Sequence, residues 1–177
     1  MRPKPEDFAA LCELAATVGA ALSARNWRLA TAESCTGGLV SAAITAVAGS
    51  SEWFDRGFVT YSNAAKSELL DVSPGVIARV GAVSAETARA MAQGAMEHST
   101  ADIAVAITGI AGPGGGSPAK PVGTIWFGLA WREPGGLHTA TRHALFFGDR
   151  ADIRLQAARL ALQWVGDTAR KPAAAAG

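Results

Sequence analysis

Residues Ala101–Thr108 form a nearly continuous apolar run, Ala-Asp-Ile-Ala-Val-Ala-Ile-Thr, within a chain of 177 residues. A strand that is apolar at successive positions is covered on both faces, as in a sheet that lies between two layers of helices. The run therefore predicts an internal strand of an α/β protein. A chain of this length is enough for one domain with a sizeable core.

Helical spacing and turn residues divide the rest of the chain into further elements. We expect helices over residues 6–25, 37–48, 84–98 and 149–165, a helix from Ser62-Asn63, a loop over 72–81, and strands over 27–32, 53–61, 123–132 and 137–147. Early βα units followed by a hairpin predict a three-layer α/β/α fold with a mixed, mainly parallel sheet and a C-terminal antiparallel hairpin. One domain is expected over residues 6–165, with flexible termini at 1–5 and 166–177.

The composition argues against several kinds of partner. Lys and Arg number 16 and Asp and Glu 15, giving a net charge of +1, so no nucleic-acid surface is indicated. No apolar run approaches the roughly 20 residues that span a bilayer, and the N-terminus lacks the apolar core of a secretory signal. Two Cys and three scattered His do not supply a structural zinc site. We therefore expect a cytoplasmic protein without a membrane partner or a metal.

The stretch from Leu29 to Val40 reads as a strand, a tight turn and a helix, because an apolar run becomes polar and glycine-rich and then apolar again. The turn places Ser34, Cys35 and Thr36 where free backbone N–H groups and the helix dipole favour negative charge. Ser34 could serve there as a nucleophile beside an oxyanion site, or only as a helix cap.

Two further segments could bring polar groups to the same edge, since ligands of such sheets sit at the carboxyl ends of parallel strands. One is Tyr61–Lys66, which offers a phenol, the amide of Asn63 and an amine. The other is Thr108–Gly116, which includes Gly109 and is rich in glycine but fits neither the P-loop nor the dinucleotide pattern. The first segment could instead hold only a solvated helix lysine and a core aromatic residue. The second could be no more than a flexible connection.

A serine hydroxyl needs a base, and no histidine occupies a comparable strand end. His98 ends a helix, and His138 and His143 lie in the last hairpin, so a Ser-His-Asp triad is unattractive. A lysine can be the base if burial lowers its pKa, which makes Lys66 the candidate. Cys35 has no paired histidine and is more consistent with a small buried residue.

An arginine stands at the start of the last helix, in Gly148-Asp149-Arg150. Arg150 could pair with a phosphate, or form a surface salt bridge with Asp149 or Asp152.

Several ordered motifs together resemble the CinA C-terminal domain family. They are Ala32–Gly38, Gly57–Lys66, Val83-Ser84 before a helix, Ala106–Gly115 and Pro121–Thr124. The resemblance covers about residues 6–165. It implies hydrolysis of the carboxamide of nicotinamide mononucleotide to nicotinate mononucleotide and ammonia, without a cofactor.

The family's nucleophile falls on Ser34 and its lysine on Lys66, while Tyr61 and Thr108 match positions of the same pocket and Arg150 resembles a ligand-binding arginine. On this reading Lys66, with Tyr61 as a relay, takes the proton of Ser34. The N–H groups of Thr36, Gly37 and Gly38 hold the oxyanion, and the helix cap passes from Ser34 to Thr36. Asn63, Thr108, Gly109 and Arg150 are the further substrate-binding residues.

Other functions remain open at this point. A non-catalytic module could bind a nucleotide or sugar phosphate in the same cleft, and a scaffolding role would leave the convergence of three polar loops unexplained. Ser34 and Lys66 within hydrogen-bond reach would favour the enzyme, and Lys66 in solvent would favour the module. The expected partner is a small pyridine nucleotide, and we expect a homo-oligomer.

Overall fold

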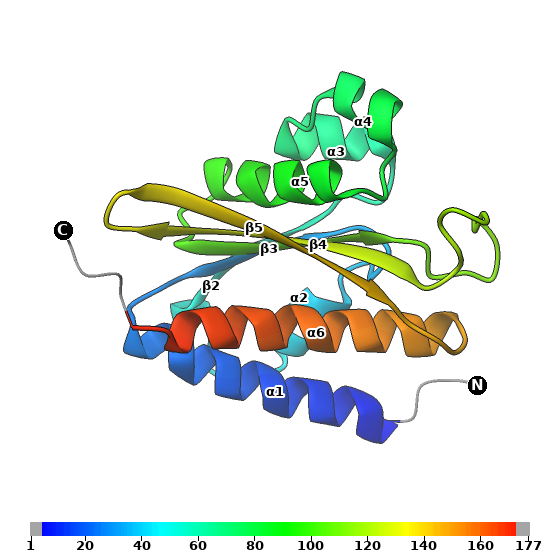
Figure 1. Cartoon of the computed structure of the whole chain (residues 1–177). Helices are drawn as coiled ribbons and strands as arrows, with labels where there is room; N and C mark the ends of the chain where they lie inside the picture. The colour runs from blue at the N-terminus through cyan, green and yellow to red at the C-terminus, as the bar shows by residue number, and fades with distance from the viewer. Residues whose placement is uncertain (1–4, 173–177) are drawn as a thin grey trace.

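In a computed structural model that describes residues 5–172, a mixed sheet lies between two helical layers (Figure 1). The strand order is β2-β1-β3-β4-β5. The strands are β1 (Leu29–Glu33), β2 (Phe54–Val59), β3 (Ile103–Gly109), β4 (Thr124–Glu133) and β5 (Gly136–Leu145). Strand β1 pairs in parallel with β2 and β3, and β3-β4 and β4-β5 are antiparallel. The α/β class, the mixed sheet and the C-terminal hairpin are thus confirmed.

The helices divide between the two faces of the sheet. On one side lie α1 (Pro5–Ala24), α2 (Leu39–Thr45) and α6 (Arg150–Arg170), and on the other α3 (Asn63–Leu70), α4 (Pro74–Val80) and α5 (Ala85–Glu97) (Figure 1). A short 3-10 helix, η1, covers Ser50–Glu52. Every residue of β1, and Ile103–Thr108 of β3, are buried, which explains why the apolar run does not alternate.

Two apolar clusters hold the layers together. Leu29, Val105 and Phe127 belong to the cluster beneath α1, α2 and α6. Ala104 and Met91 belong to the cluster beneath α5. Because side chains of a strand alternate between faces, Ala104 and Val105 of the same strand enter different clusters.

Helix α1 contains a stretch, Asp7–Ala24, with the length and composition that a membrane span needs, which the inspection of apolar runs did not suggest. Its apolar side chains have another explanation in this fold. Leu11, Val18 and Leu22 are buried in the core cluster that α1 shares with α6. One face of α1 therefore packs in the core, and 28% of the residues in this stretch are buried.

Two sequence-based boundaries were wrong. Helix α6 continues past Val165 to Arg170, because Thr168 and Ala169 are buried, so residues 166–170 belong to the helix rather than to a tail. Residues 74–80, expected within a loop, form α4, whose first position is Pro74. Proline at the first position of a helix gives up an N–H that has no partner there anyway. Pro5, expected in a flexible end, is instead the first residue of α1. The expectation of flexible ends at residues 1–4 and 173–177 lies outside the described residues.

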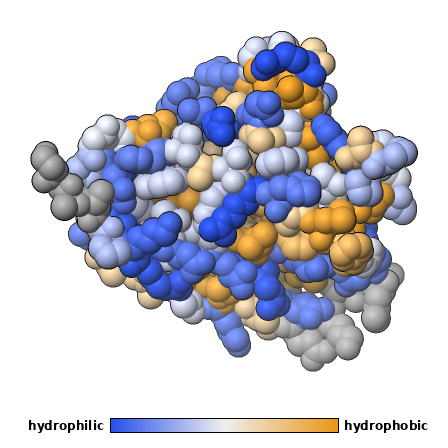
Figure 2. Space-filling model, viewed as in Figure 1, coloured by the Kyte–Doolittle hydropathy of each residue, from blue (hydrophilic) through white to orange (hydrophobic). Residues whose placement is uncertain are grey.

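The carboxyl ends of the three parallel strands are level with one another. Glu33 is in register with Val59 on one side and with Ile107 on the other. The loop between β3 and β4 and the start of α6 project on this same side of the molecule (Figure 1). Figure 2 shows polar and apolar residues interspersed on the viewed face, with apolar surface gathered toward that side.

Candidate active site

Ser34 is the first residue after β1, and its position is fixed by backbone hydrogen bonds. Its N–H donates to the carbonyl of Ile107 at 3.0 Å, so the turn begins while still attached to β3. The N–H of Gly37 then donates to the carbonyl of Ser34 at 3.0 Å. Gly37 and Gly38 have φ values of 59° and 90°, which a residue without a Cβ adopts at little cost. The sequence Thr36-Gly37-Gly38 therefore makes the tight reversal into α2.

The helix cap of this turn is Glu33, which the sequence analysis did not identify. Its buried carboxylate accepts hydrogen bonds from the N–H groups of Gly38, Val40 and Ser41 at 3.0, 3.1 and 2.8 Å, and from the Ser41 hydroxyl at 2.7 Å. The prediction that Thr36 caps the helix was wrong, since the Thr36 hydroxyl is buried without a hydrogen-bond partner among the described residues. A carboxylate reaches more orphan N–H groups than a threonine hydroxyl can.

This cap also corrects the expected oxyanion site. The N–H of Gly38 is occupied by Glu33, and that of Gly37 by the Ser34 carbonyl. Within residues 5–172, the amides of Cys35 and Thr36 donate to no other residue. The N–H groups left to a ligand in this turn are therefore those of Cys35 and Thr36.

Lys66 extends from the first turn of α3 into the interior and is 1% exposed. Its Nζ lies 3.0 Å from the Oγ of Ser34 and 2.9 Å from the carbonyl oxygen of Thr60. The carbonyl oxygens of Tyr61 and Ser62 are each 3.5 Å away. The interpretation of Lys66 as a solvated helix lysine is thus excluded by its burial.

Burial is also the main influence on the ionisation of both groups that flank Ser34. Burial lowers the pKa of the Lys66 amine from its ordinary value, because the charged form loses its hydration. Burial raises the pKa of the Cys35 thiol to about 12. Cys35 is therefore a neutral thiol at pH 7, unsuited to be the nucleophile, and it places no negative charge beside Lys66.

Tyr61 lies at the rim of the site and is 60% exposed. Its hydroxyl oxygen accepts a hydrogen bond from Nη2 of Arg150 at 2.9 Å, and Nη1 of Arg150 donates to the carbonyl of Gly112 at 2.8 Å. In the described part of the chain, Lys66 reaches Tyr61 only through the main-chain carbonyl. The phenol is therefore paired with the arginine and does not link Lys66 to Ser34.

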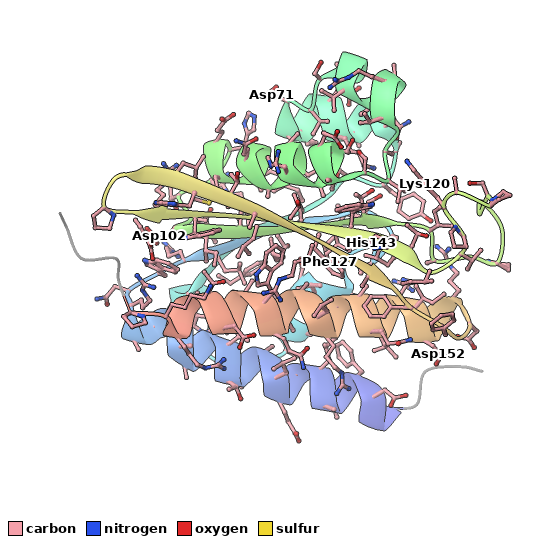
Figure 3. The ribbon with its side chains drawn as sticks, in the orientation of Figure 1. Asp71, Asp102, Lys120, Phe127, His143 and Asp152 are labelled. Carbon is pink, nitrogen blue, oxygen red and sulfur yellow. The ribbon has the colours of Figure 1, made fainter. Side chains whose placement is uncertain are left out.

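Thr108 and Gly109 end β3 directly beside Ser34. The buried Thr108 hydroxyl donates to the carbonyl of Ala82 at 2.8 Å, which fixes the opposite wall of the site. A Cβ at Gly109 would lie 2.8 Å from the carbonyl oxygen of Thr124, so only glycine allows the loop to leave β3 this close to β4. The loop that joins β3 to β4 is tethered at Lys120, which is labelled in Figure 3. The Lys120 amine donates to the carbonyls of Val80 and Val83 at 3.0 and 2.7 Å.

These segments enclose a cavity of about 220 Å³. It contains most of the side chains singled out from the sequence, and its lining consists of Ser34, Cys35, Tyr61, Asn63, Lys66, Ala82, Val83, Thr108, Gly109, Ala111 and Arg150. A second recess, of about 430 Å³, adjoins the start of α6 and shares Arg150 with the first. Of the predicted site residues, Thr36, Gly37 and Gly38 lie outside both linings.

The histidines are engaged elsewhere. His98 is 2.7 Å from the carboxylate of Asp71, His138 stacks on Trp131, and His143 packs against Trp126. None of them lines the cavity beside Ser34. Across the described residues, no group of three or more His, Cys, Asp or Glu side chains is placed to hold a metal ion. The polar side-chain groups that line this cavity are therefore two hydroxyls, a thiol, an amide, an amine, a phenol and a guanidinium.

Comparisons with known proteins identify the family of this chain. A family model described as the CinA C-terminal domain matches residues 11–169. The chain is 56% identical over 153 residues to the nicotinamide-nucleotide amidohydrolase PncC of Enterobacter agglomerans, covering 86% of this chain and 92% of that protein. Its identity to the protein of the same name from Escherichia coli K12 is 52% over 153 residues, covering 86% and 91%. The solved structure of competence/damage inducible protein CihA from Agrobacterium tumefaciens matches with a TM-score of 0.86 at 41% identity, covering 97% of this chain and 99% of that one.

Proposed function

Because this chain belongs to the CinA C-terminal domain family, we propose that it is a nicotinamide-nucleotide amidohydrolase in which Ser34 is the nucleophile and Lys66 the general base. The reaction converts nicotinamide mononucleotide (NMN) to nicotinate mononucleotide and ammonia. The observation that carries the assignment of residues is the 3.0 Å contact between the buried Lys66 amine and the Ser34 hydroxyl. A general base must lie within this reach of the proton that it removes.

In the first half of the reaction, neutral Lys66 takes the proton of Ser34 as Oγ bonds to the carboxamide carbon. The carbonyl oxygen becomes an oxyanion, for which the amides of Cys35 and Thr36 are the free donors in the turn. The C–N bond then breaks, and the Lys66 ammonium returns its proton to the leaving nitrogen, which departs as ammonia. An ester between Ser34 and the nicotinoyl group remains.

In the second half, a water molecule attacks this ester while Lys66 takes one of its protons. The ester C–O bond breaks, Ser34 recovers its proton from Lys66, and nicotinate mononucleotide leaves. In an enzyme molecule that enters the reaction with Lys66 neutral, Lys66 carries a charge only between the two proton transfers of each half-reaction. The carbonyl oxygens of Thr60, Tyr61 and Ser62 around Nζ can accept hydrogen bonds from the ammonium during that interval.

The two adjoining cavities could bind different parts of the substrate. The smaller one holds Ser34 and Lys66, and would receive the carboxamide and its ring. Arg150 stands between this cavity and the larger recess, where its guanidinium could bind the phosphate of the nucleotide. Tyr61 then orients Arg150 rather than relaying a proton, and Asn63 and Thr108 complete the wall around the ring.

The proposal is tested by incubating the protein with NMN and measuring ammonia and nicotinate mononucleotide, with Ser34→Ala as the matched variant. Wild-type turnover that the variant lacks is the expected result. Equal activity of Ser34→Ala would remove Ser34 from the mechanism. Binding of NMN without turnover by the wild-type protein would favour the alternative, a non-catalytic module for nucleotides or sugar phosphates. The burial of Lys66 against Ser34 argues for the enzyme.

A cytoplasmic location and a homo-oligomeric state are further parts of the proposal. Large apolar side chains are exposed near the start of α6, with Phe147 at 77% and Leu145 at 42%. Burying them against a second copy would remove apolar surface from water. Light scattering on the purified protein measures the mass of the assembly, and a monomeric mass would contradict the oligomer.

A further inference from the structure

Helix α6 carries two arginines that contact different parts of the site. Arg150 and Arg154 are four residues apart and therefore lie on one face of the helix. Arg150 contacts Tyr61 and the glycine-rich loop at the rim. Arg154 lines the larger recess together with Arg150, but its Nη2 donates to the carbonyl oxygen of Thr36 at 2.6 Å. This contact joins positions 118 residues apart in the chain.

The carbonyl of Thr36 and the N–H of Gly37 belong to one planar peptide unit. The N–H of Gly37 donates to the carbonyl of Ser34 at 3.0 Å. A chain of hydrogen bonds thus runs from the Arg154 guanidinium through this peptide to the main chain of Ser34. Polarisation of the peptide by the cation strengthens its other hydrogen bond.

The turn also lies between two opposite charges. The Glu33 carboxylate holds N–H groups on the helix side, and the Arg154 guanidinium holds a carbonyl on the other. No carboxylate among the described side chains, those of residues 7–172, forms an ion pair with Arg154. Its Nε is buried and unpaired within the same part of the chain. The half-buried Arg154 thus directs its positive charge to a main-chain carbonyl of the turn that carries Ser34, and not to a carboxylate.

We propose that Arg154 is a positioning residue, which holds the peptide between Thr36 and Gly37 so that Ser34 faces Lys66. It acts through the main chain of the turn and contacts neither Ser34 Oγ nor Lys66. The proposal rests on the function proposed above, because it assigns Arg154 a part in the same reaction. It separates the two arginines of α6 by role, with Arg150 assigned to the nucleotide and Arg154 to the nucleophile.

The test compares Arg154→Met and Arg154→Lys with Arg159→Met, an exposed arginine of the same helix. For Arg154→Met we expect kcat with NMN to fall by about 10²-fold, the cost of a slightly misplaced nucleophile, while KM changes by no more than about 2-fold. Arg154→Lys keeps one charged donor and should fall between that variant and wild type. Arg159→Met should match wild type. Circular dichroism identifies any variant that does not fold. If Arg154→Met does not fold, Arg154→Lys is compared with wild type and with Arg159→Met instead.

Two further measurements show whether a loss of activity comes from a misplaced Ser34, from an unstable protein, or from an error in the proposed function. Millimolar guanidinium should raise kcat of Arg154→Ala and leave that of Arg159→Met unchanged. A fluorophosphonate probe reports the reactivity of Ser34 without NMN, and its rate should fall with kcat in Arg154→Met. If the wild-type protein does not hydrolyse NMN, the proposed function fails while the probe still tests Arg154. Unchanged kcat and labelling rate in Arg154→Met, or a rise in KM alone, would overturn the inference.

Discussion

The Nζ of Lys66 lies 3.0 Å from the Oγ of Ser34, although 32 positions separate the two residues in the chain. Ser34 reaches this place at the end of β1, and Lys66 in the first turn of the helix that follows β2. Because β1 and β2 are parallel neighbours, their carboxyl ends are brought to one edge. The pair is therefore a product of the parallel crossover, and each residue can be tested separately.

The rate of NMN hydrolysis should rise with pH over a range that lies below the ordinary lysine pKa. Lys66 acts as a base only when neutral, and its burial lowers its pKa. We expect kcat/KM to increase through that lowered pKa and to level off above it. Measurements should begin above pH 7, because the phosphate of NMN itself titrates near pH ~6. An inflection at or above the pKa of a free lysine would contradict the role of Lys66 as a buried base.

The same burial should make stability depend on pH. The unfolded chain binds a proton at Lys66 up to its ordinary pKa of 10.5, whereas the folded protein releases it earlier. Between these two pKa values the unfolded state holds more protons, so the free energy of unfolding rises with pH, by up to about 1.4 kcal/mol per pH unit. Lys66→Met lacks this contribution. Urea unfolding of both proteins from neutral pH to pH ~10 measures the difference, and parallel curves would show that Lys66 is not desolvated.

Replacing Glu33 should destabilise the protein because its carboxylate accepts four hydrogen bonds in the interior. Glu33→Ala leaves buried N–H groups without an acceptor, and we expect a loss of roughly 2–4 kcal/mol in the free energy of unfolding. Glu68→Gln, at an exposed position of α3, is the matched control and should change stability little. A Glu33→Ala variant as stable as that control would show that the cap contributes nothing.

Arg150→Met should raise KM for NMN by roughly 10- to 100-fold, since a charged hydrogen bond to phosphate contributes about 1.5–3 kcal/mol. Nicotinamide riboside lacks the phosphate of NMN, so a comparison of the two substrates tests whether Arg150 binds that phosphate. Wild-type protein should favour NMN over the riboside, and the variant should lose most of that preference. An undiminished preference would locate the phosphate site elsewhere. Tyr61→Phe removes one of the two hydrogen-bond partners of Arg150 and keeps the ring, so it should have a smaller effect of the same kind.

The layers of the fold could be anticipated because their signals are local. Ser34 and Lys66 could be named as candidates at neighbouring strand ends, but the contact between them could not be established from the sequence. The uninterrupted apolar run of β3 requires cover on both faces, and the glycines after Ser34 mark a turn at a strand end. Helix α4 was missed for a different reason. Pro74 and Gly75 read as a loop, whereas proline at the first position of a helix is also a start signal.

Glu33 and Arg154 could not be recognised from their surroundings in the sequence. A glutamate at the end of a strand ordinarily faces water, and nothing in its neighbours shows that its carboxylate will fold back onto three amides. Arg154 sits among alternating polar and apolar residues of a helix, and its partner lies far away in the chain. Both roles depend on tertiary contacts to backbone groups, which carry no side-chain signature.

The place of β2 at the border of the sheet has a consequence for refolding. Strand β2 has a neighbour on one side only, and the N–H of Thr60 just beyond it donates to the carbonyl of Glu33 at 2.8 Å. If β2 were to detach, β1, β3 and the C-terminal hairpin would still be joined to one another, yet the amine would leave the hydroxyl. The return of NMN turnover after denaturation therefore reports when β2 pairs with β1. We expect it to occur after the helical circular dichroism signal has returned.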